Sequence, residues 1–172
     1  ECSRRAPGEI GMLRSSFIDM LGRIRAREVE RDRALERARR LGRFYAMLSA
    51  TNRAIVHCRD EVELMEQICR TAVEEGGFRL AWVGKLMDEE GTVEVVAGYG
   101  ATGYLESLKV KVWEGEEARG PTGTALREGR PVACEDIASD PLMAPWRERA
   151  LSFGFRSSCA LPLYRRGRAW GD

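Results

Sequence analysis

The sequence has very little histidine and no closely spaced cysteines. His57 is the only histidine among 172 residues, and the five cysteines include no Cys-x-x-Cys pair. Structural zinc sites need several Cys or His ligands at close spacing, so we expect no metal site. An odd number of isolated cysteines is typical of unpaired thiols in a reducing compartment.

Long apolar runs and a strong excess of one charge are also missing. No stretch of about 18 apolar residues occurs, and no signal peptide opens the chain, so we expect no membrane span within it. The net charge is +1, from which we expect no nucleic-acid partner. Apolar residues make up 44% of the chain, which is enough for the core of a globular domain.

Proline is absent from residues 8–58, which favours one long helix. Apolar residues recur there with alternating spacings of three and four, as in a coiled coil. The seam positions are Ile10, Leu13, Phe17, Met20, Ile24, Arg27, Arg31, Ala34, Ala38, Leu41, Tyr45, Leu48, Asn52 and Ile55. Arg27 and Arg31 should make the seam loosest where they lie, and Asn52 could fix its register.

We expect this helix to pair with the same helix of a second copy. The contacts are assigned to the larger side chains of the seam, which are Phe17, Met20, Ile24, Leu41, Tyr45 and Leu48. The alternative is a single amphipathic helix that packs on its own domain.

Helical and strand patterns alternate after residue 58. Asp60 can cap a helix over residues 60–75, which Gly76 and Gly77 end. Strands are expected at 78–88, 92–100, 108–114, 131–137 and 157–166, and short helices at 122–129 and 145–155. This order indicates an α+β fold with a central, largely antiparallel sheet flanked by helices and preceded by the long N-terminal helix.

Three motifs in order resemble a GAF domain over residues 44–172. They are GGFRLAWVGKL, GPTGTALREGRPVACEDIASDP and PWRERALSFGFRSSCALPL. The resemblance implies a central antiparallel sheet with helices on one face and a small-molecule pocket on the other. It also implies a further strand and a long helix after Gly171, so the GAF domain is expected to be incomplete at its C-terminal end.

Residues 8–24 resemble the second half of a HAMP domain. Glu9 and Gly11 match its Glu-x-Gly signature and Phe17 falls on a core position, although Ile18 stands where that family usually has Asn. We therefore divide the chain into a HAMP-like helix at 1–27, a coiled-coil connector at 28–43 and the GAF domain. The resemblance implies a cytoplasmic part of a receptor that is anchored in the inner membrane by segments upstream.

The run 120–141 is expected to wall the pocket. Such pockets are mostly apolar with a few placed polar groups, so the ligand contacts are assigned to Trp82, Tyr99, Trp113, Asp136, Asp140, Trp146, Arg147 and Ser157. Three plainer roles compete with this assignment. Trp82 could be a core residue, Gly120 and Gly123 could simply make a turn, and Asp140 or Ser139 could cap a helix.

Catalysis and bound cofactors are not expected. The GAF-fold reductases of free methionine sulfoxide place a catalytic Cys in the segment that is GPTGTA here, and haem would need an axial histidine in the pocket. The expected function is a regulatory sensor that binds a small molecule and relays the signal through a dimeric helix to an output domain, a histidine kinase or a diguanylate cyclase. The alternative is a ligand-free dimerisation and relay module.

Overall fold

The structure is a computed structural model that describes residues 7–108, 110–165 and 168–171. Two compact units divide the chain, Glu1–Tyr45 and Ala46–Asp172. The first six residues of the expected HAMP-like segment and the last residue of the expected GAF domain lie outside the described residues.

Helix α1 (Pro7–His57) confirms the long N-terminal helix that the absence of proline predicts. It accounts for all the described residues of the first unit and continues into the second. Between Gly11 and Tyr45, every side chain that the structure describes is exposed, including Phe17 at 57% and Leu41 at 55%. The apolar seam of this helix therefore has no cover within the described part of the chain.

The second unit continues with helix α2 (Glu61–Glu74), which begins as predicted at Asp60. The Asp60 carboxylate accepts a hydrogen bond from the Glu63 amide at 2.8 Å, and the Glu63 carboxylate accepts one from the Arg59 amide at 2.9 Å. This reciprocal arrangement satisfies amides that the first helical turn leaves without partners. The chain leaves the helix through Gly77, whose φ of 76° favours glycine.

The central sheet has five strands in the order β3-β2-β1-β7-β6, and neighbouring strands in it pair antiparallel. The strands are β1 (Leu80–Leu86), β2 (Thr92–Gly100), β3 (Val110–Lys111), β6 (Leu163–Arg165) and β7 (Arg168–Gly171). β1 and β2 form the predicted hairpin, with Ala81 opposite Tyr99 and Trp82 opposite Gly98. The mixed helical and antiparallel architecture confirms the expected fold class.

Several strands differ from the sequence-based prediction. The strand expected at 157–166 is interrupted at Pro162, which has no amide to donate, and its halves join different sheets. Its first half, β5 (Ser158–Ala160), pairs with β4 (Val132–Cys134) in a separate two-stranded sheet. Among the described residues of the strand expected at 108–114, only the two of β3 are in a strand, and β7 was not expected.

Short helices connect these strands. They are η1 (Thr102–Ser107), η2 (Glu116–Arg119), α3 (Pro121–Glu128), η3 (Pro141–Met143) and α4 (Arg147–Ser152). The helix expected at 145–155 is thus only six residues long.

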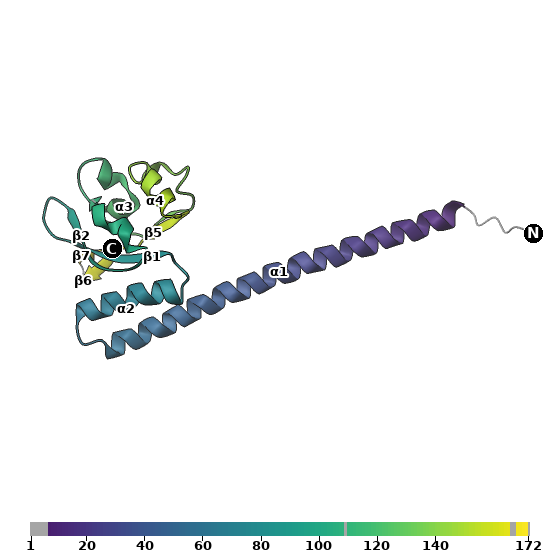
Figure 1. Ribbon diagram of the computed structural model, residues 1–172, viewed down its shortest axis with the longest axis horizontal. Helices are drawn as coiled ribbons and strands as arrows, with labels where there is room; N and C mark the ends of the chain where they lie inside the picture. The colour runs from purple at the N-terminus through teal and green to yellow at the C-terminus, as the bar shows by residue number, and fades with distance from the viewer. Residues whose placement is uncertain (1–6, 109, 166–167, 172) are drawn as a thin grey trace, which may run out of the picture. The chain divides into compact units, whose positions relative to one another are not determined.

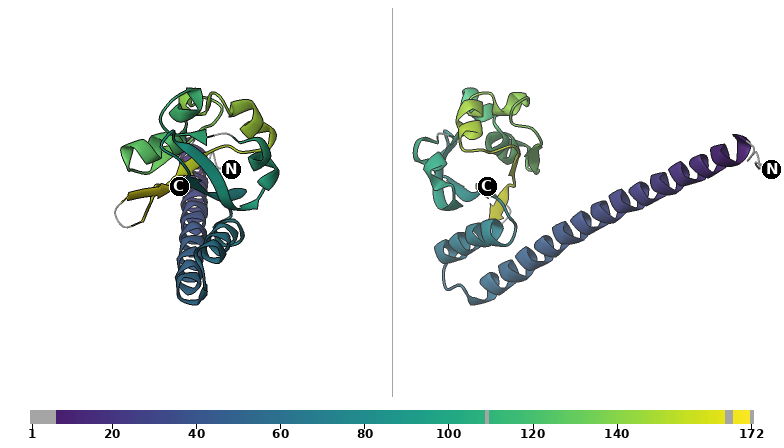
Figure 2. Two further views of the ribbon diagram at one scale, coloured as in Figure 1. Left: turned by 90° about the vertical axis from the view of Figure 1, so that its left-hand side faces the viewer. Right: turned by 45° about the vertical axis from the view of Figure 1, so that its right-hand side comes forward.

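Within the second unit the sheet is covered on both faces, with α2 on one side and α3 and α4 on the other (Figures 1 and 2). Alternation along β1 explains this, since successive side chains point to opposite faces. Val83 packs with Met65 and Cys69 of α2, whereas Trp82 packs against a cluster that includes Leu126 of α3. Among the described helices, none combines the length and the apolar character needed to cross a bilayer.

Candidate functional site

The face of the sheet opposite α2 is covered by residues 120–156, which we call the α3–α4 layer. A core cluster joins four of its residues, Cys134, Ile137, Met143 and Ala150, to Tyr104 of η1. Trp146 and Phe153 pack against this cluster and are themselves partly buried. The layer contains four of the eight expected ligand-binding residues, Asp136, Asp140, Trp146 and Arg147, on neighbouring short segments.

Trp146 lies directly over Gly120, the residue before α3. A Cβ built on Gly120 would overlap the six-membered ring of Trp146. Gly120 has a φ of −67°, which any residue can adopt, so backbone conformation does not require glycine here. Glycine is required here because the indole of Trp146 approaches the backbone closely. Gly120 therefore does more than make a turn.

Gly123 has a similar but stricter role. A Cβ there would lie 2.8 Å from the Lys111 carbonyl oxygen and would also overlap the carbonyl of Ala118. Both neighbours are backbone atoms, which give way less easily than the end of a side chain. Gly123 therefore allows α3 to approach β3 and η2 closely.

Asp136 and Asp140 stabilise the loop between β4 and α4. The Asp136 carboxylate accepts hydrogen bonds from the Ser139 hydroxyl at 2.6 Å and the Ala138 amide at 3.2 Å. These bonds lower the pKa of Asp136, so it stays ionised at neutral pH. Asp140 accepts from the Leu142 amide at 2.9 Å and so caps η3, the plainer of the two roles that the sequence allowed.

Arg147 joins the two ends of the same loop. Its Nε donates to the Ile137 carbonyl at 3.2 Å and its Nη2 to the Asp140 carbonyl at 2.9 Å. A guanidinium has five N–H donors, so these two bonds leave donors for another acceptor. The side chain is partly buried beside Trp146, and it is a permanent positive charge in this layer.

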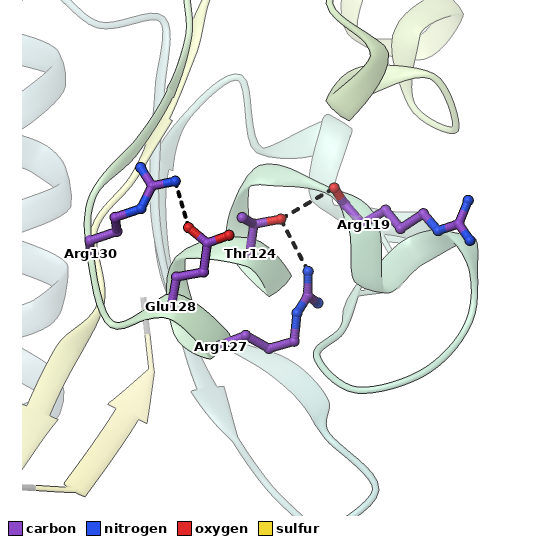
Figure 3. Close-up of polar contacts among 5 residues, drawn as sticks. All are labelled: Arg119, Thr124, Arg127, Glu128 and Arg130. Atoms are coloured by element: carbon purple, nitrogen blue, oxygen red, sulfur yellow. Dashed lines mark hydrogen bonds and ion pairs between the residues drawn. The ribbon is translucent and has the colours of Figure 1, made fainter.

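A second arginine, Arg127 of α3, fixes the segment before the layer. Its Nη1 donates to the carbonyl oxygens of Val112, at 2.6 Å, and Ala118, and its Nη2 donates to the Thr124 hydroxyl at 3.3 Å. The Thr124 hydroxyl in turn donates to the Arg119 carbonyl (Figure 3). Figure 3 also shows the exposed ion pair between Arg130 and Glu128, at 2.5 Å. These residues flank Gly129, where the helix ends with a φ of 64°.

Arg149 of α4 is a third arginine of this kind, and sequence reasoning did not identify it. It donates to the carbonyl oxygens of Gly103, at 2.9 Å, and Tyr104, at 3.2 Å. Its guanidinium also lies 5.6 Å from the ring centres of Tyr104 and Phe153, within cation–π distance. No pattern in the sequence indicated this role, because η1, whose carbonyl oxygens accept these bonds, was not expected.

The other four expected ligand-binding residues do not join the site. Tyr99 points to the α2 face, where its hydroxyl donates to Glu74 at 2.7 Å and Arg70 lies 5.3 Å from its ring centre. Trp82 lies on the other face of the sheet, the one that α3 covers, and packs there against the core cluster that includes Leu126. The four aromatic residues therefore do not line one cavity, and Trp82 has the core role that the sequence left open.

Trp113 and Ser157 lie further out. Trp113 is 49% exposed and borders a shallow, open hollow whose other lining residues are Leu86, Met87, Asp88 and Glu89. Its indole contacts Gly91, which has a φ of 85°. Ser157 is exposed and immediately precedes β5.

The two buried thiols offer little nucleophilic chemistry. Burial raises the pKa of both Cys69 and Cys134 to about 11. A thiolate, not a thiol, is the nucleophile, so both side chains are unreactive at neutral pH. Within the described residues, no group of three His, Cys, Asp or Glu side chains is placed to hold a metal ion.

We expect iodoacetamide at pH 7.5 to alkylate the exposed Cys159 and to leave Cys69 and Cys134 unmodified. Buried thiols with a pKa near 11 have a thiolate fraction of roughly 10⁻³ to 10⁻⁴ at this pH. Mass spectrometry of the digested protein measures the modification, and the urea-unfolded chain is the control in which all thiols react. Rapid labelling of Cys134 in the folded protein would contradict the assigned burial.

Comparison with known proteins agrees with this architecture. The sequence model of the GAF domain family matches residues 58–171. The fold is similar to the nlh2 GAF domain of A. aeolicus in an inactive state, with a TM-score of 0.59, 14% identity, and 77% of each chain covered. No curated protein matches the sequence significantly.

Two other solved structures have the same fold. The GAF domain of a phosphoenolpyruvate-protein phosphotransferase from Coxiella burnetii has a TM-score of 0.57 at 14% identity, with 74% of each chain covered. Free methionine-R-sulfoxide reductase from Neisseria meningitidis, in complex with its substrate, has a TM-score of 0.58 at 18% identity. That match covers 73% of this chain and 67% of the reductase. On the family match, which spans about two thirds of its length, this chain belongs to the GAF domain family.

Proposed function

We propose that this chain is the sensor module of a signal-transduction receptor. A small anionic molecule binds in the α3–α4 layer, and its binding is relayed through a dimer of α1 to an output domain. Membership of the GAF family supports this proposal, because GAF domains are common regulatory and sensory modules. The HAMP-like motif at 8–24 supports a membrane-anchored parent, with a histidine kinase or a diguanylate cyclase as its output.

The proposal of ligand binding rests mainly on one observation, the close contact of the Trp146 ring with Gly120. This indole covers the backbone at the start of α3, where the helix dipole favours negative charge. A ligand that displaces the ring can contact the backbone at the start of α3. It can also bind the neighbouring Arg147, which still has N–H donors after bonding the Ile137 and Asp140 carbonyls. An acidic group on the ligand would meet both.

The exposed seam of α1 supports the relay. Phe17, Met20, Ile24, Leu41, Tyr45 and Leu48 are between 45% and 65% exposed. A coiled-coil dimer would bury these side chains. A ligand can shift such a dimer between two arrangements only as far as its affinities for the two arrangements differ. A nearly complete switch needs a difference in binding free energy of about 5.5 kcal/mol.

We expect a binding ligand to raise the melting midpoint by several degrees and to change the tryptophan fluorescence. Nucleotides, organic acids and aromatic acids are screened against the full chain. The shift should disappear in Arg147→Ala, and it should persist in Arg130→Ala, which removes an exposed arginine whose partner is Glu128. Each variant is compared with its own ligand-free midpoint, because Arg147→Ala also loses two hydrogen bonds.

A second candidate is a ligand-free relay module, and one observation favours it. The polar side chains of the layer already bond to its own backbone, and the aromatic residues pack into core clusters rather than around one cavity. A screen without any hit, together with a stable dimer, would favour this candidate over the sensor.

Regulation rather than turnover is proposed for either candidate. The GPTGTA segment has no cysteine, and the pKa values of the buried thiols Cys69 and Cys134 are raised. Incubation with free methionine sulfoxide and a thiol reductant tests this directly. Release of methionine above the rate of a Cys134→Ser and Cys159→Ser variant would overturn the regulatory assignment.

A further inference from the structure

Trp113 is an exposed aromatic side chain whose position is fixed by its neighbours. Its five-membered ring lies over Gly91, where an added Cβ would come within 2.6 Å of the indole Cδ1. The Val112 amide donates to the Gly91 carbonyl at 2.8 Å, which ties the backbone before Trp113 to the turn of the β1–β2 hairpin. Trp113 is nevertheless 49% exposed. Trp is enriched among the residues that dominate interface energies, so a fixed and exposed indole is typical of an interface anchor.

The hollow beside Trp113 is too open to enclose a small molecule. Its volume is about 520 Å³, and Leu86, Met87, Asp88 and Glu89 form the rest of its lining. Met87 is 49% exposed and adds apolar surface to the same hollow. Pockets for small molecules bury about 70–90% of the ligand surface, whereas a shallow hollow leaves much of it in water. The shape therefore suits a side chain of a larger partner, whose own surface covers what the hollow does not.

Net negative charge is concentrated around this hollow. Residues 44–172 contain 20 acidic residues and 16 lysines and arginines. The whole excess of four is present in two short segments, 85–92 and 111–117, which hold six acidic residues and two lysines. The pairing of β2 with β3 brings the two segments together, with Thr92 opposite Lys111. The other charges of residues 44–172 balance, so this end of the unit has a negative potential that attracts cations.

The carboxylates at this end are exposed and ionised. Those that the structure describes as exposed are Asp88, Glu89, Glu90 and Glu114. Asp88 accepts a hydrogen bond from the Thr92 amide at 2.9 Å, which lowers the pKa of Asp88. Within the described part of the chain, no ion pair neutralises these carboxylates, and no cation lies over the Trp113 ring. They also form no group that could hold a metal ion there, so a larger, organic cation fits this surface better.

We infer that the Trp113 hollow and its acidic rim dock an arginine-rich segment of a partner protein. A guanidinium group can stack on the face of Trp113 and donate paired hydrogen bonds to a carboxylate such as Glu89. A lysine ammonium lacks the planar face that stacks on an indole, so arginine fits this surface better. The hollow lies outside the α3–α4 layer, so this inference does not depend on the small-molecule site proposed above.

Titration of the full chain with an arginine peptide tests the docking. The probe is Gly-Arg-Gly-Arg-Gly-Arg-Gly with blocked ends, and NMR follows the indole N–H resonance of Trp113, which Trp113→Phe assigns. This resonance should shift and saturate, whereas that of Trp146 should stay unchanged. The same peptide with lysine in place of arginine should bind roughly two- to fivefold more weakly. A peptide that shifts Trp146 and leaves Trp113 unchanged would overturn the assignment.

A pair of matched double variants separates this surface from general charge attraction. Glu89→Gln with Glu90→Gln should weaken peptide binding by roughly three- to tenfold at low salt. The control, Glu66→Gln with Glu75→Gln, removes the same charge from exposed positions on α2 and at its end, and it should change binding less than about twofold. Equal weakening by the two double variants would mean that net charge alone attracts the peptide, and the docking surface would be wrong.

The role of the indole needs a variant that keeps the apolar packing. Trp113→Leu retains an apolar side chain over Gly91 and removes the aromatic face, so it should weaken binding by about two- to fivefold. Its melting midpoint shows whether the fold is retained, and the glutamate variants test the surface independently. Unchanged binding by Trp113→Leu would overturn the stacking. Tetramethylammonium that binds as tightly as the peptide would instead indicate a site for small cations and overturn the protein partner.

Discussion

Gly123→Ala should destabilise the GAF unit by about 1–3 kcal/mol and lower its melting midpoint by roughly 10 °C. The added methyl group would overlap the carbonyl groups of Ala118 and Lys111. The Ala118 oxygen also accepts a hydrogen bond from Arg127, so moving it weakens a second contact. Denaturant unfolding followed by tryptophan fluorescence measures the change.

Gly42→Ala is the matched control for this prediction. It makes the same chemical change in helix α1, where nothing lies within 4 Å of the added Cβ. Alanine is favoured over glycine in an open helix by about 1 kcal/mol, so helicity measured by circular dichroism should rise slightly. If Gly123→Ala were as well tolerated as Gly42→Ala, the close approach of α3 to its neighbours would be wrong.

Replacing Leu41 and Leu48 together by Ser should weaken the α1 dimer by at least about a hundredfold. Both leucines are 55% exposed in the single chain and lie on the apolar seam. A symmetric dimer would bury four such side chains, each of which contributes about 1.5–3 kcal/mol when it leaves water. Sedimentation equilibrium over a range of concentrations measures the dissociation constant.

Val29→Ser is the control for the seam variant. Val29 is exposed to a similar extent, 48%, but lies on the face of α1 opposite the seam. It should leave the dissociation constant unchanged. Equal weakening by both substitutions would mean that the helices do not meet along this seam, and a monomeric parent chain would remove the relay mechanism.

The elements that the sequence predicted well are those with strong local signals. The proline-free heptad pattern predicted α1, and the Asp60 cap with two closing glycines predicted α2. The alternating segments around residues 88–91 predicted the β1–β2 hairpin. Each signal lies within the element it predicts, so local physical chemistry was sufficient.

The remaining strands are short, and some of their partners are distant in sequence. β7 has only four residues, too few for a clear alternating pattern; it pairs with β6 just before it and, through Gly171, with Lys85 of β1, more than 80 positions away. Pro162 was visible as a residue that cannot donate to a sheet, and it could have divided the strand expected at 157–166. The assignment of β5 to its own sheet could not be foreseen in the same way.

In the candidate site, too, the sequence predicted what one local segment determines and missed what depends on distant segments. Asp136, Asp140 and Arg147 come together because one short loop carries them all. Tyr99 lies apart from them on the α2 face, because its face depends on the register of the hairpin, in which it stands opposite Ala81 rather than Trp82. Arg127 and Arg149 were overlooked because they bond to backbone carbonyls of segments whose path the sequence did not indicate.

Arg127, Arg147 and Arg149 all stabilise irregular segments by donating hydrogen bonds to backbone carbonyl oxygens. Every amino acid supplies such an acceptor, so the braced positions can change their side chains without losing the hydrogen bond. The loops around the site are therefore free to vary in composition, and hence in what they recognise, while three arginines preserve their path.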